Sequence, residues 1–372
     1  MKQSRLLSRL DAAIARLGES VSLHCLRIER SCYLARKGDV EEARATLVEL
    51  RRRYEKHPNV IVSAWLSLAE GLLIHFSNMG PEARDKVHRA YALSAAAGLT
   101  QLNALSAAWL AHMDYSLENF PGMASFVSQA LQLAKNDNHS ALSRASLVTA
   151  DAYHLAGRIE LAKPWYAKAH EHATAEGDDA TISALMHNMA WLRFDNQRQA
   201  TFNGGVVTSS GQHAFASVES TIQFERLVGA DGLHALSPIL RAQILTENDR
   251  FAEALAAYDL NLASAVQQGM GRLHGNLKAD EAWCRLNLGQ IEEARADAGV
   301  AEALIDPRGY DGDRAPAHRR LSQVFAGLGD PDSSKRHDDL ARASWEQHRL
   351  HQQQIIDVLI APQNNAILNF LR

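Results

Sequence analysis

The sequence is poor in cysteine, proline and aromatic residues, and it carries no excess of charge of one sign. Its three cysteines, Cys25, Cys32 and Cys284, are too few for a disulfide framework in 372 residues. The formal charge is −4, from 39 basic and 43 acidic residues, which gives no sign of the concentrated basic surface that nucleic-acid binding needs. We therefore expect neither a disulfide-stabilised secreted domain nor a nucleic-acid partner.

Signals for export or membrane insertion are also missing. The first residues contain scattered charges, without the apolar core and cleavage site of a secretory leader. The most apolar long stretch, residues 60–76, contains Glu70 and several small residues, which favours a buried core helix over a membrane span. We expect a cytoplasmic protein without a membrane partner.

No motif for catalysis or metal binding is present. Among the 17 histidines, His170 and His172 are two apart and point to different sides of a helix. His348 and His351 can share a face, but no acidic or cysteine partner has a convincing spacing. The glycine-rich segment 203–211 lacks the Lys-Ser/Thr of a phosphate loop. The sequence therefore predicts no enzyme, no metal and no cofactor.

What the sequence does contain is a helical repeat, since alanine and leucine are abundant and strand-like alternation is nearly absent. A sequence motif with Gly or Asp at its second position and Ala at its end recurs at 37–43, 156–162, 248–254 and 288–294. A divergent copy of this motif lies at 328–334. When weaker copies are included, the motif ends at positions 43, 83, 124, 162, 200, 254, 294 and 334. All the spacings are 38 to 41 residues except one of 54, so the chain is a repeat protein.

A second small residue precedes the last residue of each motif, and in six of the eight cases it lies twelve positions earlier. The pairs are Ser31/Ala43, Gly71/Ala83, Ala111/Ala124, Ala150/Ala162, Ala190/Ala200, Ala242/Ala254, Ala282/Ala294 and Ser322/Ser334. Small side chains let two antiparallel helices approach closely, and Gly or Asp in the turn ends the first helix and caps the second. A large residue three positions after the first small one is expected to fill the space between the helices, as at Leu34, Ile74, Tyr153, Leu245 and Phe325.

This pattern resembles the tetratricopeptide repeat over roughly residues 20 to 345. The period near 40 is longer than the common 34-residue unit and is similar to the long-helix variants of bacterial regulatory and signalling proteins. The family's early tryptophan and late proline are mostly missing. The resemblance implies an all-α solenoid of about eight helix-turn-helix units that coil into a right-handed superhelix.

We divide the chain into an N-terminal capping helix (1–18), the repeat solenoid (19–345) and a C-terminal extension (346–372). The glycine-rich residues 203–212 form an inserted loop, read either as a tolerated surface insertion or as a flap over the groove. From about Ser333 one long helix runs to Pro362. It is interpreted as a cap whose tail folds back on the last repeat, or as a dimerisation or partner-docking helix, which makes a homodimer possible.

The resemblance also implies where ligands bind, because the first helices of successive tetratricopeptide units line a concave groove. Carried over to this sequence, the groove residues are His112, Asp151, His154, His187, Trp191, Gln243, Asp280, Trp283, Arg319 and Gln323. Each of them could instead pack between neighbouring units.

We expect a non-enzymatic regulatory scaffold that binds a protein or peptide in this groove. The alternative is a sensory domain for a small ligand or signal peptide, related to the tetratricopeptide regions of cyclase-type signalling proteins but without the output domain.

Overall fold

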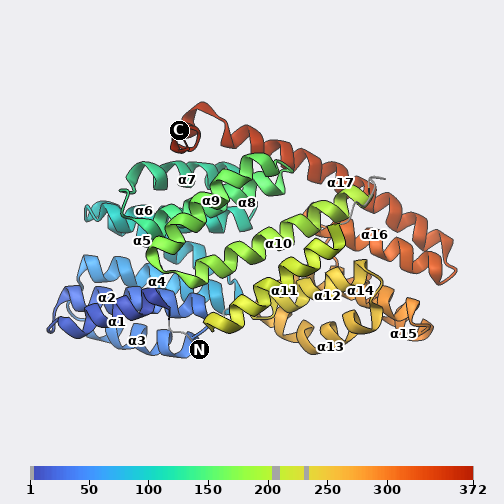
Figure 1. The fold of residues 1–372 in the computed structure, drawn as a ribbon, viewed down its shortest axis with the longest axis horizontal. Helices are drawn as coiled ribbons and strands as arrows, with labels where there is room; N and C mark the ends of the chain where they lie inside the picture. The colour runs from blue at the N-terminus through green and yellow to red at the C-terminus, as the bar shows by residue number, and fades with distance from the viewer. Residues whose placement is uncertain (1–3, 203–209, 230–233, 372) are drawn as a thin grey trace. The chain divides into compact units, whose positions relative to one another are not determined.

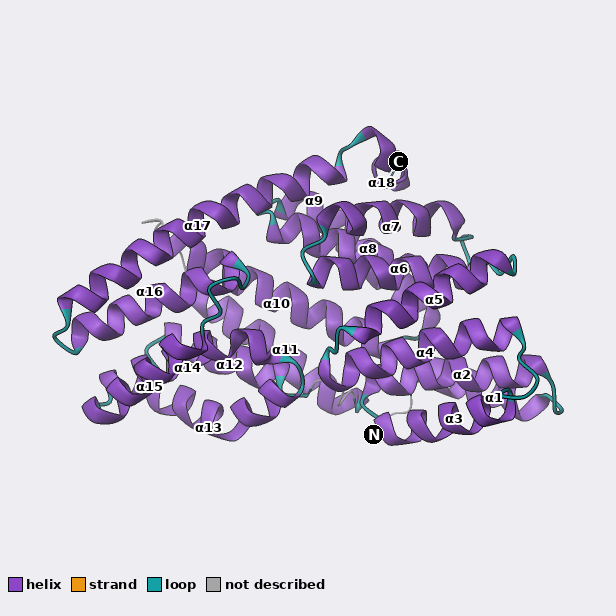
Figure 2. Ribbon diagram, turned by 180° about the vertical axis from the view of Figure 1, so that it is seen from behind, coloured by secondary structure: helices purple, strands orange, loops and turns teal. Residues whose placement is uncertain are grey.

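The structure is a computed structural model that describes residues 4–202, 210–229 and 234–371. The described residues form eighteen α-helices and no strand (Figures 1 and 2), so the predicted all-α fold is confirmed. The chain divides into two compact units. Unit 1 comprises Met1–Asn188, Gln223–Leu233 and Gln354–Arg372, and unit 2 comprises Met189–Ile222 and His234–Gln353.

Unit 1 contains the helices of the first four repeats and both ends of the described chain. They are α1 (Arg5–Arg16), α2 (Val21–Lys37), α3 (Val40–Arg53), α4 (Val60–Asn78), α5 (Glu82–Ala96), α6 (Thr100–Ser116), α7 (Phe120–Leu133), α8 (His139–Leu155), α9 (Ile159–Glu176), η2 (Pro362–Asn364) and α18 (Asn365–Phe370).

Unit 2 contains the later repeats. Its helices are α12 (Leu236–Glu247), α13 (Phe251–Gln267), η1 (Met270–Leu273), α14 (His274–Asn287), α15 (Ile291–Leu304) and α16 (Asp311–Gly327). Three further helices give residues to both units: α10 (Asp179–Phe202), α11 (Ser210–Val228) and α17 (Pro331–Leu359).

Seven of the eight predicted turns lie where the repeated motif predicts them. They separate α2 from α3, α4 from α5, α6 from α7, α8 from α9, α12 from α13, α14 from α15 and α16 from α17. In the first turn Gly38 has φ 105° and donates its N–H to the carbonyl of Leu34 at 3.0 Å, which ends α2. Asp249 takes the same left-handed conformation after α12, with φ 57°. Gly and Asp recur at the second position of the motif because the backbone there needs a positive φ.

The predicted small residues lie where paired helices approach closely. Ala43, Ala124, Ala162, Ala254 and Ala294 are all fully buried. At Gly71 of α4 an added Cβ would lie 2.6 Å from Cγ2 of Val87 and 2.9 Å from the carbonyl oxygen of Ala83, both on α5. No side chain fits between α4 and α5 at this point, which is why glycine replaces the usual alanine.

The fifth pair is the exception, and its predicted turn is wrong. Helix α10 runs through Ala200 to Phe202, and Ala200 is exposed. No glycine stands between Ala190 and Ala200 to end the helix, so it continues. Instead, Ala190 and Phe194 pack with Ala214 and Val218 of α11 in one apolar cluster of unit 2.

The inserted loop was predicted over residues 203–212. Helix α11 begins at Ser210, so residues 210–212 are helical rather than loop. Residues 203–209 lie outside the described part of the chain.

Helix α1 buries Leu6, Leu7 and Leu10 and packs on α2. It also contacts the turn after α9, because the Leu6 N–H and the Ser4 hydroxyl both donate to the carbonyl of Gly177, at 3.2 and 3.0 Å. The N-terminal helix thus joins the first repeat of unit 1 to the end of the fourth.

The C-terminal tail does not follow the interpretation of a cap on the last repeat. Helix α18 packs on α7 of the third repeat, and Ile367 is buried there. The Phe370 ring stacks on that of Trp165 in α9, with centroids 5.4 Å apart. An apolar tail binds wherever a matching apolar surface is available, and this surface lies within unit 1.

Helix α4, the apolar stretch of the sequence, is long and apolar enough to cross a membrane by length and composition. In unit 1 it packs between α2 and α5, and Val62, Leu66, Leu68 and Leu72 are buried. It is a core helix, and this burial explains its composition.

A glycine pair tests the close approach of α4 and α5. Gly71→Ala should lower the free energy of unfolding by about 1–3 kcal/mol, because the added methyl overpacks the contact with Val87 and Ala83. Gly299→Ala in α15 is the control, since a Cβ there meets nothing within 4 Å and should stabilise the helix by about 0.5–1 kcal/mol. Urea denaturation measures both, and equal effects would contradict steric contact as the cause.

Candidate ligand-binding site

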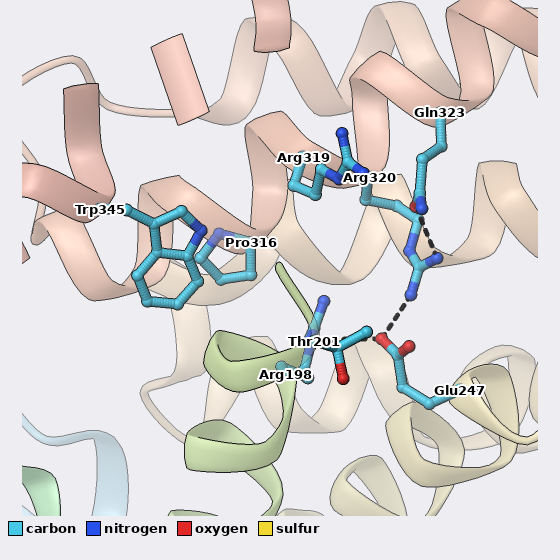
Figure 3. Close-up of a pocket in the computed structure, with 8 residues that line it drawn as sticks. All are labelled: Arg198, Thr201, Glu247, Pro316, Arg319, Arg320, Gln323 and Trp345. Carbon is cyan, nitrogen blue, oxygen red and sulfur yellow. Dashed lines mark hydrogen bonds and ion pairs between the residues drawn. The ribbon is translucent and has the colours of Figure 1, made fainter. Parts of the chain in front are cut away.

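A cleft in unit 2 lies between the C-terminal ends of α10 and α12, the middle of α16 and one residue of α17 (Figure 3). Its unfilled space of about 470 Å³ includes space open to solvent. Its lining residues are Arg198, Thr201, Glu247, Pro316, Arg319, Arg320, Gln323 and Trp345. The indole of Trp345 and the ring of Pro316 lie side by side and form an apolar wall, while the other lining residues are polar.

Arg320 is the centre of the polar wall. Its Nε donates to Asp280 of α14 at 2.8 Å, its Nη1 donates to the amide oxygen of Gln323 at 2.9 Å, and its Nη2 donates to Glu247. Arg198 completes the group, with Nε 3.2 Å from Glu247 and Nη2 3.6 Å from Asp280. Two guanidinium groups and two carboxylates thus form one network that connects α10, α12, α14 and α16.

This network is balanced in charge although most of it is buried. Burial alone would lower the pKa of Arg320, but the carboxylates of Glu247 and Asp280 outweigh that effect and raise it above its ordinary value. Arg320 therefore stays charged at any physiological pH. Glu247 is the partly exposed member of the network, and Arg319, paired with Asp338 at 2.9 Å, lies partly exposed at the same cleft.

The sequence placed six groove residues in unit 2, and four of them gather around Arg320. Arg319 and Gln323 line the cleft, and Asp280 lies behind its wall as the partner of Arg320. Trp283 packs against Leu321 and Phe325, with the Arg320 guanidinium 5.4 Å from its ring centroid.

The other two residues predicted in unit 2 lie apart from the cleft. Trp191 packs against the apolar cluster of Ala190, Phe194 and Val218. Gln243 is buried in α12, at 5% exposure. Neither side chain lines the cleft.

The remaining predicted residues belong to unit 1, where they form buried hydrogen-bonded contacts. The Tyr166 hydroxyl donates to Asp151 at 2.9 Å and lies 3.0 Å from Nδ1 of His154. The Asn188 amide also donates to Asp151, at 2.6 Å. These side chains satisfy one another's hydrogen-bonding groups.

Two of the predicted histidines of unit 1, His112 and His187, have a pKa below the ordinary value. Nε2 of His112 lies 3.3 Å from Nε2 of His75, and burial followed by the charge of Arg144 lowers the pKa of both. Burial lowers the pKa of His187 to about 4. Within the described residues, no group of three or more His, Cys, Asp and Glu side chains can hold a metal ion.

Sequence reasoning missed Arg198, Glu247, Arg320 and Trp345. Arg320 had a usable signal, since it stands two positions before Ser322 as Asp280 stands two before Ala282. Equivalent positions in consecutive repeats face each other, and these two form a salt bridge. Glu247 and Arg198 lie at helix ends, outside the positions that the repeat pattern marks.

Helix pairs stacked by their first helices define both units as tetratricopeptide-like α-solenoid structure. No known protein-family profile matches the chain, and no curated protein matches its sequence. Among solved structures, a Rap protein complexed with competence and sporulation factor has a similar fold, with a TM-score of 0.55. The two chains are 13% identical, and the match covers 93% of this chain and 92% of the Rap chain. At this identity the likeness establishes the fold.

The charge network makes a direct prediction for stability. Arg320→Met should lower the free energy of unfolding by about 3–5 kcal/mol, because it removes the closest counter-charge of buried Asp280. Adding Asp280→Asn should restore much of the loss. The exposed pair of Arg336 and Glu302 provides the control, where Arg336→Met should cost less than about 1 kcal/mol in the same urea titration. A double variant no more stable than Arg320→Met would refute the network.

The buried carboxyl of Asp151 makes a prediction for pH. Burial raises its pKa to about 7, although hydrogen bonds from Tyr166 and Asn188 act to lower it. In the unfolded chain the carboxyl titrates near 3.8, so between these values the folded state holds a proton that the unfolded state releases. This group's contribution to stability therefore falls as pH rises through that interval.

Asp151→Asn removes this titration. The free energy of unfolding of the variant, minus that of the natural protein, should grow more positive from about pH 4.5 to about pH 7.5. Denaturant titrations at several pH values measure the difference, and one that stays constant with pH would show that the carboxyl is ionised throughout.

Proposed function

We propose that this protein is a non-enzymatic regulatory scaffold that binds a peptide segment in the cleft of unit 2. The observation that carries the proposal is the gathering of an apolar wall, a partly exposed carboxylate, a guanidinium and an amide around one cleft. Trp345 and Pro316 offer an apolar anchor site, while Glu247, Arg319 and Gln323 offer hydrogen bonds at its edge.

The chemistry of the cleft suits recognition better than catalysis. Its two buried arginines are bound to carboxylates, so they act as fixed hydrogen-bonding walls and not as groups that transfer protons. Backbone and side-chain amides of an extended peptide can pair with the carboxylate and amide edge, and an apolar side chain can contact Trp345.

The solved relative adds support of a limited kind. That Rap protein was crystallised in complex with a named factor, and its chain matches this one over nearly its full length. The solenoid architecture is therefore compatible with a regulatory role through binding. We propose the same general role here and extend it to a soluble, cytoplasmic setting.

Selection from a library of random decapeptides displayed on phage tests this proposal. The peptide most enriched on the natural protein is then synthesised, and its Kd is measured by fluorescence anisotropy. Gln323→Ala and Arg319→Ala should each raise the Kd by about tenfold, because both side chains line the cleft. Trp283→Ala should instead lower the melting temperature, since this indole packs in the α14–α16 core.

Arg336→Ala is the matched control, as an exposed arginine of unit 2 that lies outside the cleft. It should leave the Kd unchanged. Failure to enrich any peptide, or enriched peptides whose affinity is indifferent to both cleft variants, would overturn the proposal.

A further inference from the structure

A second cavity lies within unit 1 and is separate from the cleft described above. It is formed by the first helices of four successive repeats, with α1 as an additional wall, and its unfilled space of about 450 Å³ includes space open to solvent. Its lining residues are Leu6, Leu10, Glu29, Cys32, Tyr33, Arg36, Trp65, Leu72, Leu105, Trp109, Ser140 and Arg144. Most of this lining is apolar, so the charged groups decide what the cavity can hold.

Arg144 of α8 is a buried cation without a counter-ion. Its residue exposure is 4%, and no carboxylate of the described residues lies within ion-pair distance of it. Its Nη2 donates to the Thr181 hydroxyl at 3.5 Å, and its Nε has no hydrogen-bond partner. The guanidinium lies 4.0 Å from the ring centroid of Trp109. A cation–π contact offsets only part of the cost of burying a charge.

The neighbouring Arg36 shows what a compensated arginine looks like in the same cavity. Its Nη2 lies 2.7 Å from Asp178, and its Nη1 donates to the Thr181 hydroxyl at 3.0 Å. Asp178 is thus already engaged by Arg36 and Thr181. The three charges Arg36, Arg144 and Asp178 leave a net positive charge at this point.

The lining carboxyl, Glu29, forms no ion pair with Arg144 among the described residues. Burial raises its pKa to about 7, with the charge of Glu176 raising it further and that of Arg9 lowering it. Burial and the charge of Arg36 lower the pKa of Arg144 to about 9, although the charges of Asp178 and Asp151 act to raise it, so Arg144 remains a cation at neutral pH. An ionised guanidinium therefore lines a mostly apolar cavity, and no carboxylate of the described residues is in direct contact with it.

We infer that this cavity is a binding site for a small organic acid, whose carboxylate pairs with Arg144 and whose apolar body contacts Trp65, Leu72 and Trp109. A bidentate carboxylate would give the unpartnered Nε its acceptor and would neutralise the buried charge. Helix α1 closes one side of the cavity through Leu6 and Leu10. The site is independent of the peptide cleft proposed for unit 2.

Thermal melting of the full chain with defined probes tests the inference. Hexanoate and phenylacetate should each raise the melting temperature in a saturable manner, with Kd confirmed by calorimetry. Acetate lacks the apolar body and hexanamide lacks the charge, so neither should do so. A tripeptide with a free C-terminus distinguishes a peptide source, and stabilisation by the tripeptide without stabilisation by either small acid would overturn the assignment.

Arg144→Met separates a ligand-binding role from a structural one. If Arg144 awaits an anion, the ligand-free variant should melt a few degrees higher than the natural protein, since a buried unpaired charge is removed, and hexanoate should no longer have an effect. A lower melting temperature, or a retained response to hexanoate, would refute the site.

Two further variants serve as controls. Arg36→Met should melt lower, because it leaves Asp178 buried and unpaired. Gln323→Ala in the cleft of unit 2 should keep the full response to hexanoate, which separates failure here from failure of the peptide proposal. Loss of the hexanoate response in Gln323→Ala would show that the acid binds in the cleft of unit 2, and it would overturn this site.

Discussion

The constraint on which the structure depends is the short distance between the two helices of each repeat. Ala, Ser or Gly at matched positions removes the side-chain bulk that would separate them, and at Gly71 even a methyl group has no room. Because this distance recurs about every forty residues, each repeat presents its first helix in the same register as the one before. Residues at equivalent positions in neighbouring repeats then face each other, as Asp280 and Arg320 do.

The same periodicity explains how much of the fold could be predicted from the sequence. The turn needs a residue in the left-handed conformation, and the helix contact needs a small side chain. Both requirements are local in sequence, so they produce a recognisable motif at seven turns. The fifth turn could not be predicted this way, because α10 has no glycine to end it and Ala200 is an ordinary exposed helical alanine. The docking of α18 on α7 was equally unreadable, since it depends on a contact between distant parts of the chain.

The site was partly predictable for a related reason. Arg319 and Gln323 lie on the inner face of a first helix, and their distance from Ser322 indicated that face. Arg198 and Glu247 reach the cleft from helix ends, where the repeat register gives no information. In unit 1 the register did identify polar inner residues, but Asp151 and His154 are satisfied by Tyr166. A pattern can assign a residue to a face, whereas only the packed structure decides whether its polar atoms are already occupied.

The buried arginines show most clearly how a structural side chain differs from one that is available to bind a ligand. Arg320 and Arg144 are almost equally buried, yet Arg320 forms ion pairs with two carboxylates, whereas Arg144 forms none with the residues that the structure describes. A cation with its counter-ions in place stabilises the arrangement of the helices that carry them, and removing either partner exposes the cost of burial. A cation without them costs free energy in every molecule of the ligand-free protein. Under the proposal made above, an anion that binds next to Arg144 offsets this cost. An arginine therefore stabilises the helix packing in unit 2, whereas in unit 1 an arginine is available to bind a ligand.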